Sequence, residues 1–360
     1  MKITDIEIKT LVLPFPAPIR IAFAVIEGAT GVFVRIKTDE GIFGIGEASP
    51  FGPVTGETVE STVAALELFR PMLIGRDPTD LEGIHADMDR LLAYNGSAKC
   101  AVDIALYDII GKAAGLPLYK VLGGANPTVE NDNTIHIDTP AEMQRLAKQY
   151  VAQGYRILKI KTGIDPETDI EAVRLIREAV GPAIRLRIDA NQGYDLCTAV
   201  RVLNAMKDLG VEAAEQPLPY WDVEGMARLR SRVPGIRIMA DESVHDPHDA
   251  MRVIRAGAAD VINIKLMKCG GIYPALKINA AAEAAGVTCM VGCMADSKIA
   301  IAAGLALVAA QRNIADADLD GFLHKKDPEM GMKGGFTYEG GTFTLTDKPG
   351  LGIDFDFDAI

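Results

Sequence analysis

The most constraining feature of the sequence is a pattern that repeats through its middle. From about Asn131, a short β-rich apolar run that ends in polar residues is followed by an amphipathic helical stretch, and the unit then recurs. The strand candidates are NTIHI, RILKIKTG, IRLRIDANQG, VEAAEQP, IRIMADES, VINIKLMKCGG, VTCMVGC and the weaker NIADADLDG. Alternating βα units imply a parallel sheet, and about this many units closing on themselves make a barrel. We therefore predict a modified TIM (β/α)-barrel, of the α/β class, over residues 126–330.

Different patterns flank this repeat. Residues 1–50 alternate between apolar and polar side chains as in an antiparallel sheet, and residues 58–122 change to helical spacing. A small sheet followed by helices predicts an α+β capping domain over residues 1–125. The tail from about Gly334 returns to a pattern of strands and turns. We expect residues 331–360 to pack back on the capping domain, which would then be discontinuous.

Charge and composition argue against several classes of function. The net charge is −12 and the sequence has no basic tract, so nucleic acid is not an expected partner. The most apolar stretch, residues 299–310, is too short to cross a bilayer and should be a buried helix, and the N-terminus does not have the pattern of a signal peptide. The five cysteines form no CxxC pair, which is typical of reduced thiols. We expect a cytoplasmic protein that binds no membrane.

Three acids stand at corresponding places in the predicted barrel. Asp189, Glu215 and Asp241 each end a strand, and successive members are 26 residues apart (189 to 215, 215 to 241), which is about one βα unit. They should lie side by side at the carboxyl end of the sheet, where barrel enzymes have their active sites. Three carboxylates in one mouth would repel one another unless a cation neutralises them, and an oxygen-only set suits Mg²⁺. We predict one Mg²⁺ ion per subunit on these acids.

Two lysines flank the acids. Lys161 ends the strand before the acidic set and Lys265 ends the strand after it, so the two should approach a substrate from opposite sides. Lys159 should point the same way as Lys161. We expect burial, the cation and a second lysine to lower the lysine pKa values, so that the amines can act as bases. The arrangement predicts removal of a proton next to a carboxylate, and two bases allow inversion, whereas one base with a leaving group would give elimination or cycloisomerisation.

In combination, these motifs resemble those of the enolase superfamily, in particular its muconate-lactonising subgroup, over essentially the whole chain. The motifs are KIK at 159–161, DANQ at 189–192, EQP at 215–217, ADES at 240–243 and NIKLMKCGG at 263–271. The resemblance implies an α+β cap over a modified barrel, Mg²⁺ on the three acids, and Lys161 and Lys265 as the acid/base pair. Asn191 and Lys268 would support the site from behind, with Glu242 as a candidate partner of Lys268.

Within that subgroup the sequence is most similar to dipeptide epimerases of the L-Ala-D/L-Glu type, which invert the C-terminal residue of a dipeptide. The pointer is Asp318-Leu-Asp320 at the last barrel strand, where those enzymes have a DxD that receives the substrate's ammonium group. Two carboxylates at i and i+2 face one cavity and can hold a cation. The likeness also implies contacts to the substrate carboxylate from Thr134 and Lys159, and to the peptide portion from the backbone around Cys293 and Ala295.

The dipeptide itself stays open at this point. Ala24 stands where the alanyl-glutamate members look to have an arginine, and Arg20 lies close enough in sequence to replace it. Cationic or hydrophobic dipeptides are equally open, because three acids could reach a substrate side chain: Glu27, Glu57 and Asp296. A muconate cycloisomerase or an o-succinylbenzoate synthase-type lyase is the alternative on the same scaffold, although its substrates lack an ammonium group for the DxD. We expect a small-molecule substrate, and a homo-oligomer whose size the sequence does not specify.

Overall fold

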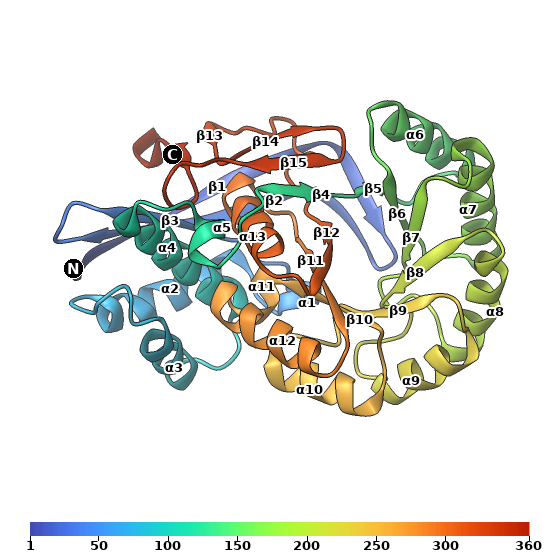
Figure 1. Cartoon of the computed structure of the whole chain (residues 1–360), viewed down its shortest axis with the longest axis horizontal. Helices are drawn as coiled ribbons and strands as arrows, with labels where there is room; N and C mark the ends of the chain where they lie inside the picture. The colour runs from blue at the N-terminus through green and yellow to red at the C-terminus, as the bar shows by residue number, and fades with distance from the viewer. Residues whose placement is uncertain (360) are drawn as a thin grey trace.

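A computed structural model describes residues 1–359, and in it an antiparallel cap adjoins a barrel of parallel strands (Figure 1). The cap sheet has the order β1-β2-β3. Its strands are β1 (Ile3–Ile21), β2 (Ala24–Thr38) and β3 (Phe43–Ala48). Its helices are α1 (Gly52–Thr55), α2 (Val59–Leu73), α3 (Leu81–Leu91), α4 (Gly96–Ala114) and α5 (Leu118–Val121).

The two glycines of β3 explain how closely α4 lies on the cap sheet. A Cβ atom built on Gly44 would lie 2.0 Å from the carbonyl oxygen of Ala105, and one on Gly46 would lie 1.9 Å from that of Ala101. Any side chain at either position would therefore push the helix off the strand. The sequence FGIGEA thus specifies a strand that a helix backbone can approach directly.

The barrel follows the predicted βα pattern and confirms the fold class. All neighbouring strands in the order β12-β11-β10-β9-β8-β7-β6-β5 are parallel. They are β5 (Asn133–Ile135), β6 (Ile157–Lys161), β7 (Arg185–Asp189), β8 (Val211–Glu215), β9 (Arg237–Ala240), β10 (Val261–Lys265), β11 (Thr288–Gly292) and β12 (Ile314–Asp318). The helices are α6 (Pro140–Ala152), α7 (Pro166–Val180), α8 (Leu196–Lys207), α9 (Val223–Arg232), α10 (Pro247–Ala256), α11 (Leu266–Cys269), α12 (Ile272–Ala284) and α13 (Lys298–Ala310).

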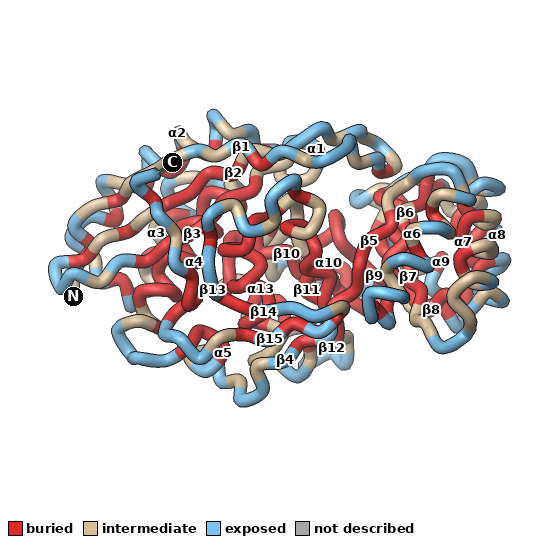
Figure 2. The backbone as a smooth tube through the Cα atoms, turned by 90° about the horizontal axis from the view of Figure 1, so that it is seen from above, coloured by how far each residue is buried: buried red, intermediate tan, exposed pale blue. Residues whose placement is uncertain are grey.

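Local sequence signals start the outer helices where the pattern predicts them. The helices α6 to α10 each begin after a residue whose side chain accepts a hydrogen bond from a backbone N–H of the first turn, namely Thr139, Asp165, Asp195, Asp222 and Asp246. Such N-caps satisfy donors that a helix cannot satisfy internally. Figure 2 shows that the buried residues gather along the strands and the inner helix faces. Helix α13 is almost entirely buried, as predicted.

The first and last barrel strands meet at a seam. Within residues 1–359 no strand ladder joins β5 to β12. Hydrogen bonds of single residues cross the gap instead: Asp132 donates its N–H to the Ala317 carbonyl at 3.3 Å, and Leu319 donates its N–H to Asn131 Oδ1 at 2.8 Å. The seam therefore depends on polar residues just outside the strands.

The tail contacts both the start of the barrel and the cap. Strand β15 (Thr342–Leu345) pairs with β14 (Phe336–Glu339) and with β4 (Thr128–Glu130), while β13 (Met332–Gly334) pairs with β16 (Ile353–Phe355). A short 3₁₀ helix, Phe357–Ala359, follows. Arg35 of the cap sheet forms an ion pair with Asp358 at 2.7 Å. The domain limits at residues 125 and 330 stay predictions.

Two further sequence expectations concern the chain as a whole. All five cysteines are free thiols. No helix in the described part of the chain combines the length and the apolar character needed to cross a bilayer.

Candidate active site

The carboxyl ends of the central strands bring the predicted lysines and acids together at the barrel mouth. The parallel register sets Lys161 beside Asp189, and Asp189 beside Glu215. Lys161 Nζ donates to Asp189 Oδ2 at 2.6 Å. At the other side of the acidic set, Lys265 Nζ lies 2.8 Å from Asp241 Oδ2. The two lysines thus flank the three acids, each in contact with one of them.

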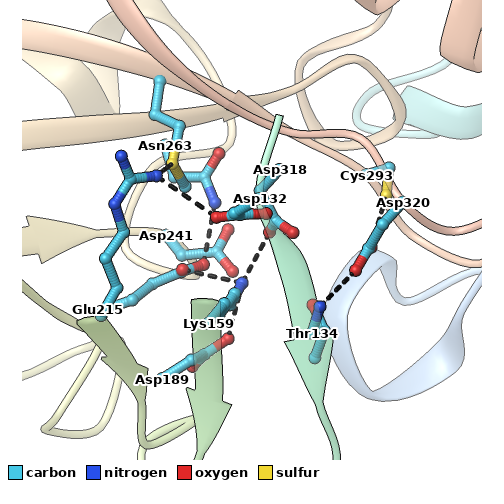
Figure 3. A network of polar contacts seen from close by, with 12 residues as sticks. Asp132, Thr134, Lys159, Asp189, Glu215, Asp241, Asn263, Cys293, Asp318 and Asp320 are labelled. Atoms are coloured by element: carbon cyan, nitrogen blue, oxygen red, sulfur yellow. Dashed lines mark hydrogen bonds and ion pairs between the residues drawn. The ribbon is translucent and has the colours of Figure 1, made fainter. Parts of the chain in front are cut away.

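Lys159 occupies the centre of this network, as Figure 3 shows. Its Nζ lies 3.0 Å from Asp189 Oδ2, 2.8 Å from Glu215 Oε2 and 2.6 Å from Asp318 Oδ2. Burial would lower the pKa of the Lys159 ammonium, but Asp189, Asp318 and Glu215 outweigh burial and raise it well above its ordinary value. Lys159 is therefore a fixed positive charge that joins the acids of β7 and β8 to the acid of β12.

The carboxylates of the mouth also act on the pKa of Lys265. Burial would lower the pKa of this ammonium, but the carboxylates of Asp241 and Glu215 outweigh burial and raise it. Conversely, burial would raise the pKa of Asp189, but Lys159 and Lys161 outweigh burial and hold it well below its ordinary value. The expected lowering of the lysine pKa includes the effect of a bound cation, so it stays a prediction for Lys265, whose amine the carboxylates surround.

Among Asp189, Glu215 and Asp241, Glu215 is the acid whose negative charge the neighbouring groups stabilise least. Burial and the neighbouring carboxylate of Asp189 raise its pKa to about 8, although Lys159 works in the opposite direction. Asn263, on β10, donates from Nδ2 to Glu215 Oε1 at 2.8 Å. A buried carboxyl group in such a place would be stabilised in its ionised form by an additional cation.

Lys268 lies behind the mouth and Asn191 lines it, and each contacts an acid or lysine of the site. Lys268 Nζ donates to Asp241 Oδ1 at 2.6 Å and also to the Asp241 carbonyl oxygen. Asn191 donates from Nδ2 to Glu242 Oε1 at 3.3 Å and accepts from Lys161 Nζ at 3.0 Å. The expected pair of Glu242 with Lys268 is therefore wrong, because Lys268 is already held by the Asp241 side chain and backbone.

The DxD of the sequence lies at the mouth, next to the seam of the barrel. Asp320 Oδ2 accepts the Thr134 N–H at 2.7 Å and lies 3.2 Å from His324 Nε2. Burial would raise the pKa of Asp320, but the nearby His324 imidazole and the hydrogen bonds keep it well below its ordinary value. Asp320 therefore remains ionised and available to a cation.

Sequence reasoning missed Asp132, which lies beside this pair. Its Oδ2 accepts from Arg187 Nη1 at 3.2 Å, and burial followed by the charge of Asp318 raises its pKa well above the ordinary value. One carboxylate oxygen from each of Asp132, Asp318 and Asp320 lies within 4.8 Å of the others, so this group could also hold a cation. Asp132 precedes a strand rather than ending one, so the pattern of polar strand ends does not include it.

A cavity of about 400 Å³ opens between the cap and the mouth, which is a size typical of small-molecule sites. Its lining near the lysines includes Lys159, Lys161, Asn191, Asp241 and Lys265. Its lining near the DxD includes Thr134, Cys293, Ala295, Asp318 and Asp320. The predicted site residues therefore line the cavity, except for Asp189, Glu215 and Lys268, which lie directly behind Lys159, Lys161 and Asp241.

His136 directly follows β5 and is a further residue of the mouth. The ring lines the cavity and packs edge-on against His324, with 4.6 Å between the ring centroids. Neither of its ring nitrogens has a hydrogen-bond partner among residues 1–359. Burial and the neighbouring His324 lower its pKa well below the ordinary value, so the imidazole is neutral.

Two family models match the chain on either side of this cavity. Residues 5–123 match the mandelate racemase / muconate lactonizing enzyme N-terminal domain, and residues 142–359 match the enolase C-terminal domain-like family. The chain belongs to the mandelate racemase/muconate lactonizing enzyme family of the enolase superfamily. The resemblance inferred from the motifs is thus confirmed.

Two epimerases and one solved structure are similar to the chain over most of its length. An L-Ala-D/L-Glu epimerase of Clostridium acetobutylicum is 44% identical to this chain, and the match covers 98% of this chain and 99% of that protein. A hydrophobic dipeptide epimerase of Enterococcus faecalis is 46% identical, with 89% of this chain and 90% of that protein covered. The solved structure of an Enterococcus faecalis dipeptide epimerase complexed with Mg and the dipeptide L-Leu-L-Tyr has a TM-score of 0.95 and 43% identity, over 98% of this chain and 100% of that one.

Proposed function

We propose that the chain is an isomerase, a Mg²⁺-dependent dipeptide epimerase that inverts the α-carbon of the C-terminal residue of an L,L-dipeptide. The observation that carries the proposal is the position of Lys161 and Lys265, whose amines contact Asp189 and Asp241 at opposite sides of one acidic set. Amines on two sides of a bound substrate can take a proton from one face and return one to the other. The epimerase names of the relatives support this reading.

The residues present fit the metal ion. Asp189, Glu215 and Asp241 are buried acids on consecutive strands, and the raised pKa of Glu215, about 8, reflects negative charge that a cation would stabilise. Mg²⁺ would supply positive charge beside the substrate carboxylate and so favour the build-up of negative charge on it. The neighbouring structure complexed with Mg and a dipeptide supports this assignment.

Two oppositely charged groups of the mouth would fix the dipeptide by its ends. The ammonium of Lys159 would contact the substrate carboxylate together with Thr134, and the Asp318 and Asp320 carboxylates would accept the N-terminal ammonium group. The backbone near Cys293 would contact the peptide bond. The α-carbon of the C-terminal residue then lies between the two flanking lysines.

Proton transfer would follow from this position. One flanking lysine removes the α-proton, the electron pair passes into the carboxylate to give an enediolate, and the other lysine protonates the opposite face. A lysine acts as a base only after losing its own proton, and acids that share their charge with a cation hold the ammonium less strongly. A positioned base of this kind contributes roughly 10²- to 10⁴-fold in rate.

Solvent deuterium exchange tests the proposal. Incubation of an L,L-dipeptide with Mg²⁺ in D₂O should give mass gain at the C-terminal α-carbon and formation of the L,D product. Lys161→Ala and Lys265→Ala should each abolish epimerisation, while each variant still exchanges the α-proton of one epimer only. Turnover of a succinylbenzoate precursor without exchange in any dipeptide would contradict the proposal and support the lyase alternative.

A further inference from the structure

We propose that the residue inverted in this cavity carries an apolar side chain, so that the substrates are hydrophobic dipeptides. The inference rests on the proposed function, because it concerns the occupant of the same cavity. The ionisable groups that line the cavity lie on its barrel side, where the two ends of the dipeptide would engage Lys159, Asp318 and Asp320. The substrate side chains are therefore left to face the cap.

The cap is positioned so that different parts of it cover the two ends of the mouth. The β1-β2 hairpin extends from the cap toward β5 and β6 (Figure 1), and the Ile137 N–H donates to the Arg20 carbonyl at 3.1 Å. Near its tip, a Cβ built on Gly163 would lie 3.1 Å from that of Ala22, and Gly163 follows Lys161 by two residues. The tip therefore lies over the end of the cavity where Lys161 would act.

The base of the hairpin and helix α1 lie over the remaining parts of the mouth. Phe15 packs under the Lys325 ammonium, 4.6 Å from ring centroid to Nζ, which places this part of the hairpin beside the loop that follows the DxD. Helix α1 lies at the other end, because the Val54 carbonyl is 2.9 Å from the Nε2 atom of His245, which follows the Asp241 loop. The tip and α1 together form the wall that faces the reacting residue.

That wall is apolar. Its cavity-lining side chains include Ile19, Ile21, Phe23, Ile26, Phe51 and Val54, and Val59 at the start of α2 extends it. The Phe23 ring of the hairpin stacks on the Phe51 ring beside α1, with centroids 6.3 Å apart and an angle of 26° between the planes. Phe23 nevertheless keeps 40% of its surface exposed. An apolar substrate side chain would cover that surface and gain the stabilisation of buried hydrocarbon.

The charged residues that could have selected another substrate do not reach the cavity. Arg20 and Glu27 are exposed and do not line it. Glu57 is buried, but its carboxylate accepts the backbone N–H groups of Ser97 and Ala98 at the start of α4. Within residues 1–359, every ionisable side chain that lines the cavity belongs to the barrel.

Asp296, the remaining acid, belongs to a different buried cluster. Burial, followed by the charge of Glu47, raises its pKa to about 8, and it does not line the cavity. A charged side chain on the reacting residue would therefore lose its hydration without gaining a partner. Because an unpaired buried polar group is unfavourable, we expect a preference of at least about tenfold for apolar dipeptides.

Exchange kinetics with three dipeptides test the inference. With Mg²⁺ in D₂O, kcat/KM for α-proton exchange should be at least about tenfold higher for L-Ala-L-Phe than for L-Ala-L-Glu or L-Ala-L-Lys. Equal values for the three dipeptides would overturn the inference but leave the proposed function intact. If no dipeptide exchanges, the proposed function fails and the inference fails with it.

A matched pair of variants tests the wall itself. Ile26 lines the cavity, whereas its neighbour Val25 is 62% exposed and does not. Ile26→Arg should shift the Glu-to-Phe ratio of kcat/KM by at least tenfold toward the glutamate dipeptide, and Val25→Arg should leave the ratio unchanged. Phe51→Ala should reduce kcat/KM for L-Ala-L-Phe more than for L-Ala-L-Ala. An unchanged ratio in both Ile26→Arg and Phe51→Ala would overturn the inference.

Discussion

Lys159 connects two acidic groups at the mouth that would otherwise act separately. Its ammonium contacts Asp189 and Glu215 on one side and Asp318 on the other. The first group lies behind the lysines, and the second lies at the seam near Thr134. Either group has carboxylates enough for a cation, and the proposed function assigns Mg²⁺ to the first and the substrate ammonium to the second.

Removal of a single carboxylate should distinguish these assignments. Asp241→Asn should weaken Mg²⁺ binding at least about tenfold, because the ion loses a charged ligand. Asp320→Asn should leave Mg²⁺ affinity nearly unchanged and should raise KM for the dipeptide. Isothermal titration calorimetry with Mg²⁺ alone measures the first effect, and exchange kinetics measure the second. The reverse pattern would move the metal to the group formed by Asp132, Asp318 and Asp320.

The sequence predicted the position of a site residue wherever that residue has a fixed place in the βα repeat. Asp189, Glu215 and Asp241 recur with the βα unit, so their strand ends and their proximity could be predicted. Asp132 belongs to no such repeat, and its place in the mouth depends on how the first strand meets the last. The raised pKa of Lys265 could not be predicted either, because it depends on which carboxylates surround the amine in three dimensions.

At the scale of elements, helix α4 and strand β3 show how sequence fixes a packing distance. Gly46→Ala should lower the free energy of unfolding by about 3 kcal/mol, because the new methyl group would meet the Ala101 carbonyl oxygen, and backbone cannot move aside as a side chain can. Gly28→Ala on the same sheet is the control, since its nearest atom would be 3.7 Å away. Chemical denaturation of both variants measures the difference. Equal losses would contradict the packing argument.

Strand β3 also joins the cap to the barrel through a buried charge cluster. Glu47 accepts hydrogen bonds from the Ser297 N–H at 2.7 Å and from the Ala300 N–H at 3.0 Å, at the start of α13. Asp296, next to Ser297, has a pKa of about 8, and burial lowers the pKa of Lys325 to about 8. The cluster makes the attachment of the cap sensitive to pH.

Asp296→Asn should stabilise the protein increasingly as pH rises from about 4 to 8. The pKa of Asp296 is raised in the folded state, so the folded chain holds a proton that the unfolded chain has lost, and the parent loses stability across this window. Asparagine does not titrate, and the gain should exceed about 1 kcal/mol at pH 8, since one pKa unit is about 1.4 kcal/mol.

Denaturant unfolding at pH 5, 7 and 9 measures this effect. The stabilisation should grow between pH 5 and 7 and should change little above pH 8. The exposed Asp138→Asn is the control, and its difference from the parent should not grow over the same range. A gain from Asp296→Asn that is the same at all three pH values would contradict the titration argument.

For the whole molecule, the barrel pattern predicted a sheet that closes but not how it closes. Alternating strands and helices imply a parallel barrel, and all eight strand segments named from the sequence contain strands of the structure. That pattern could not predict the seam between β5 and β12, because the seam depends on single hydrogen bonds rather than on strand periodicity. The seam also carries Thr134 and Asp320, so closure of the barrel and the shape of the proposed ammonium site are linked.

Asn131 tests that link. Its side chain is fully buried, accepts the Leu319 N–H at 2.8 Å, and donates to the Asp132 carbonyl at 2.8 Å. Asn131→Ala should lower the free energy of unfolding by about 1–3 kcal/mol, because a buried N–H loses its partner. It should also raise KM for the dipeptide while leaving Mg²⁺ affinity unchanged, since the DxD moves and the acids of the other strands do not.

The matched control is Asn126→Ala, which removes an exposed hydrogen bond to the Thr128 N–H on the same connection. That loss lies in solvent, where water replaces the missing acceptor, so stability and KM should both stay within error of the parent. Unfolding curves, Mg²⁺ titration and exchange kinetics on the two variants separate the outcomes. If Asn131→Ala weakened Mg²⁺ binding as much as dipeptide binding, the seam would support the whole mouth rather than its ammonium end alone.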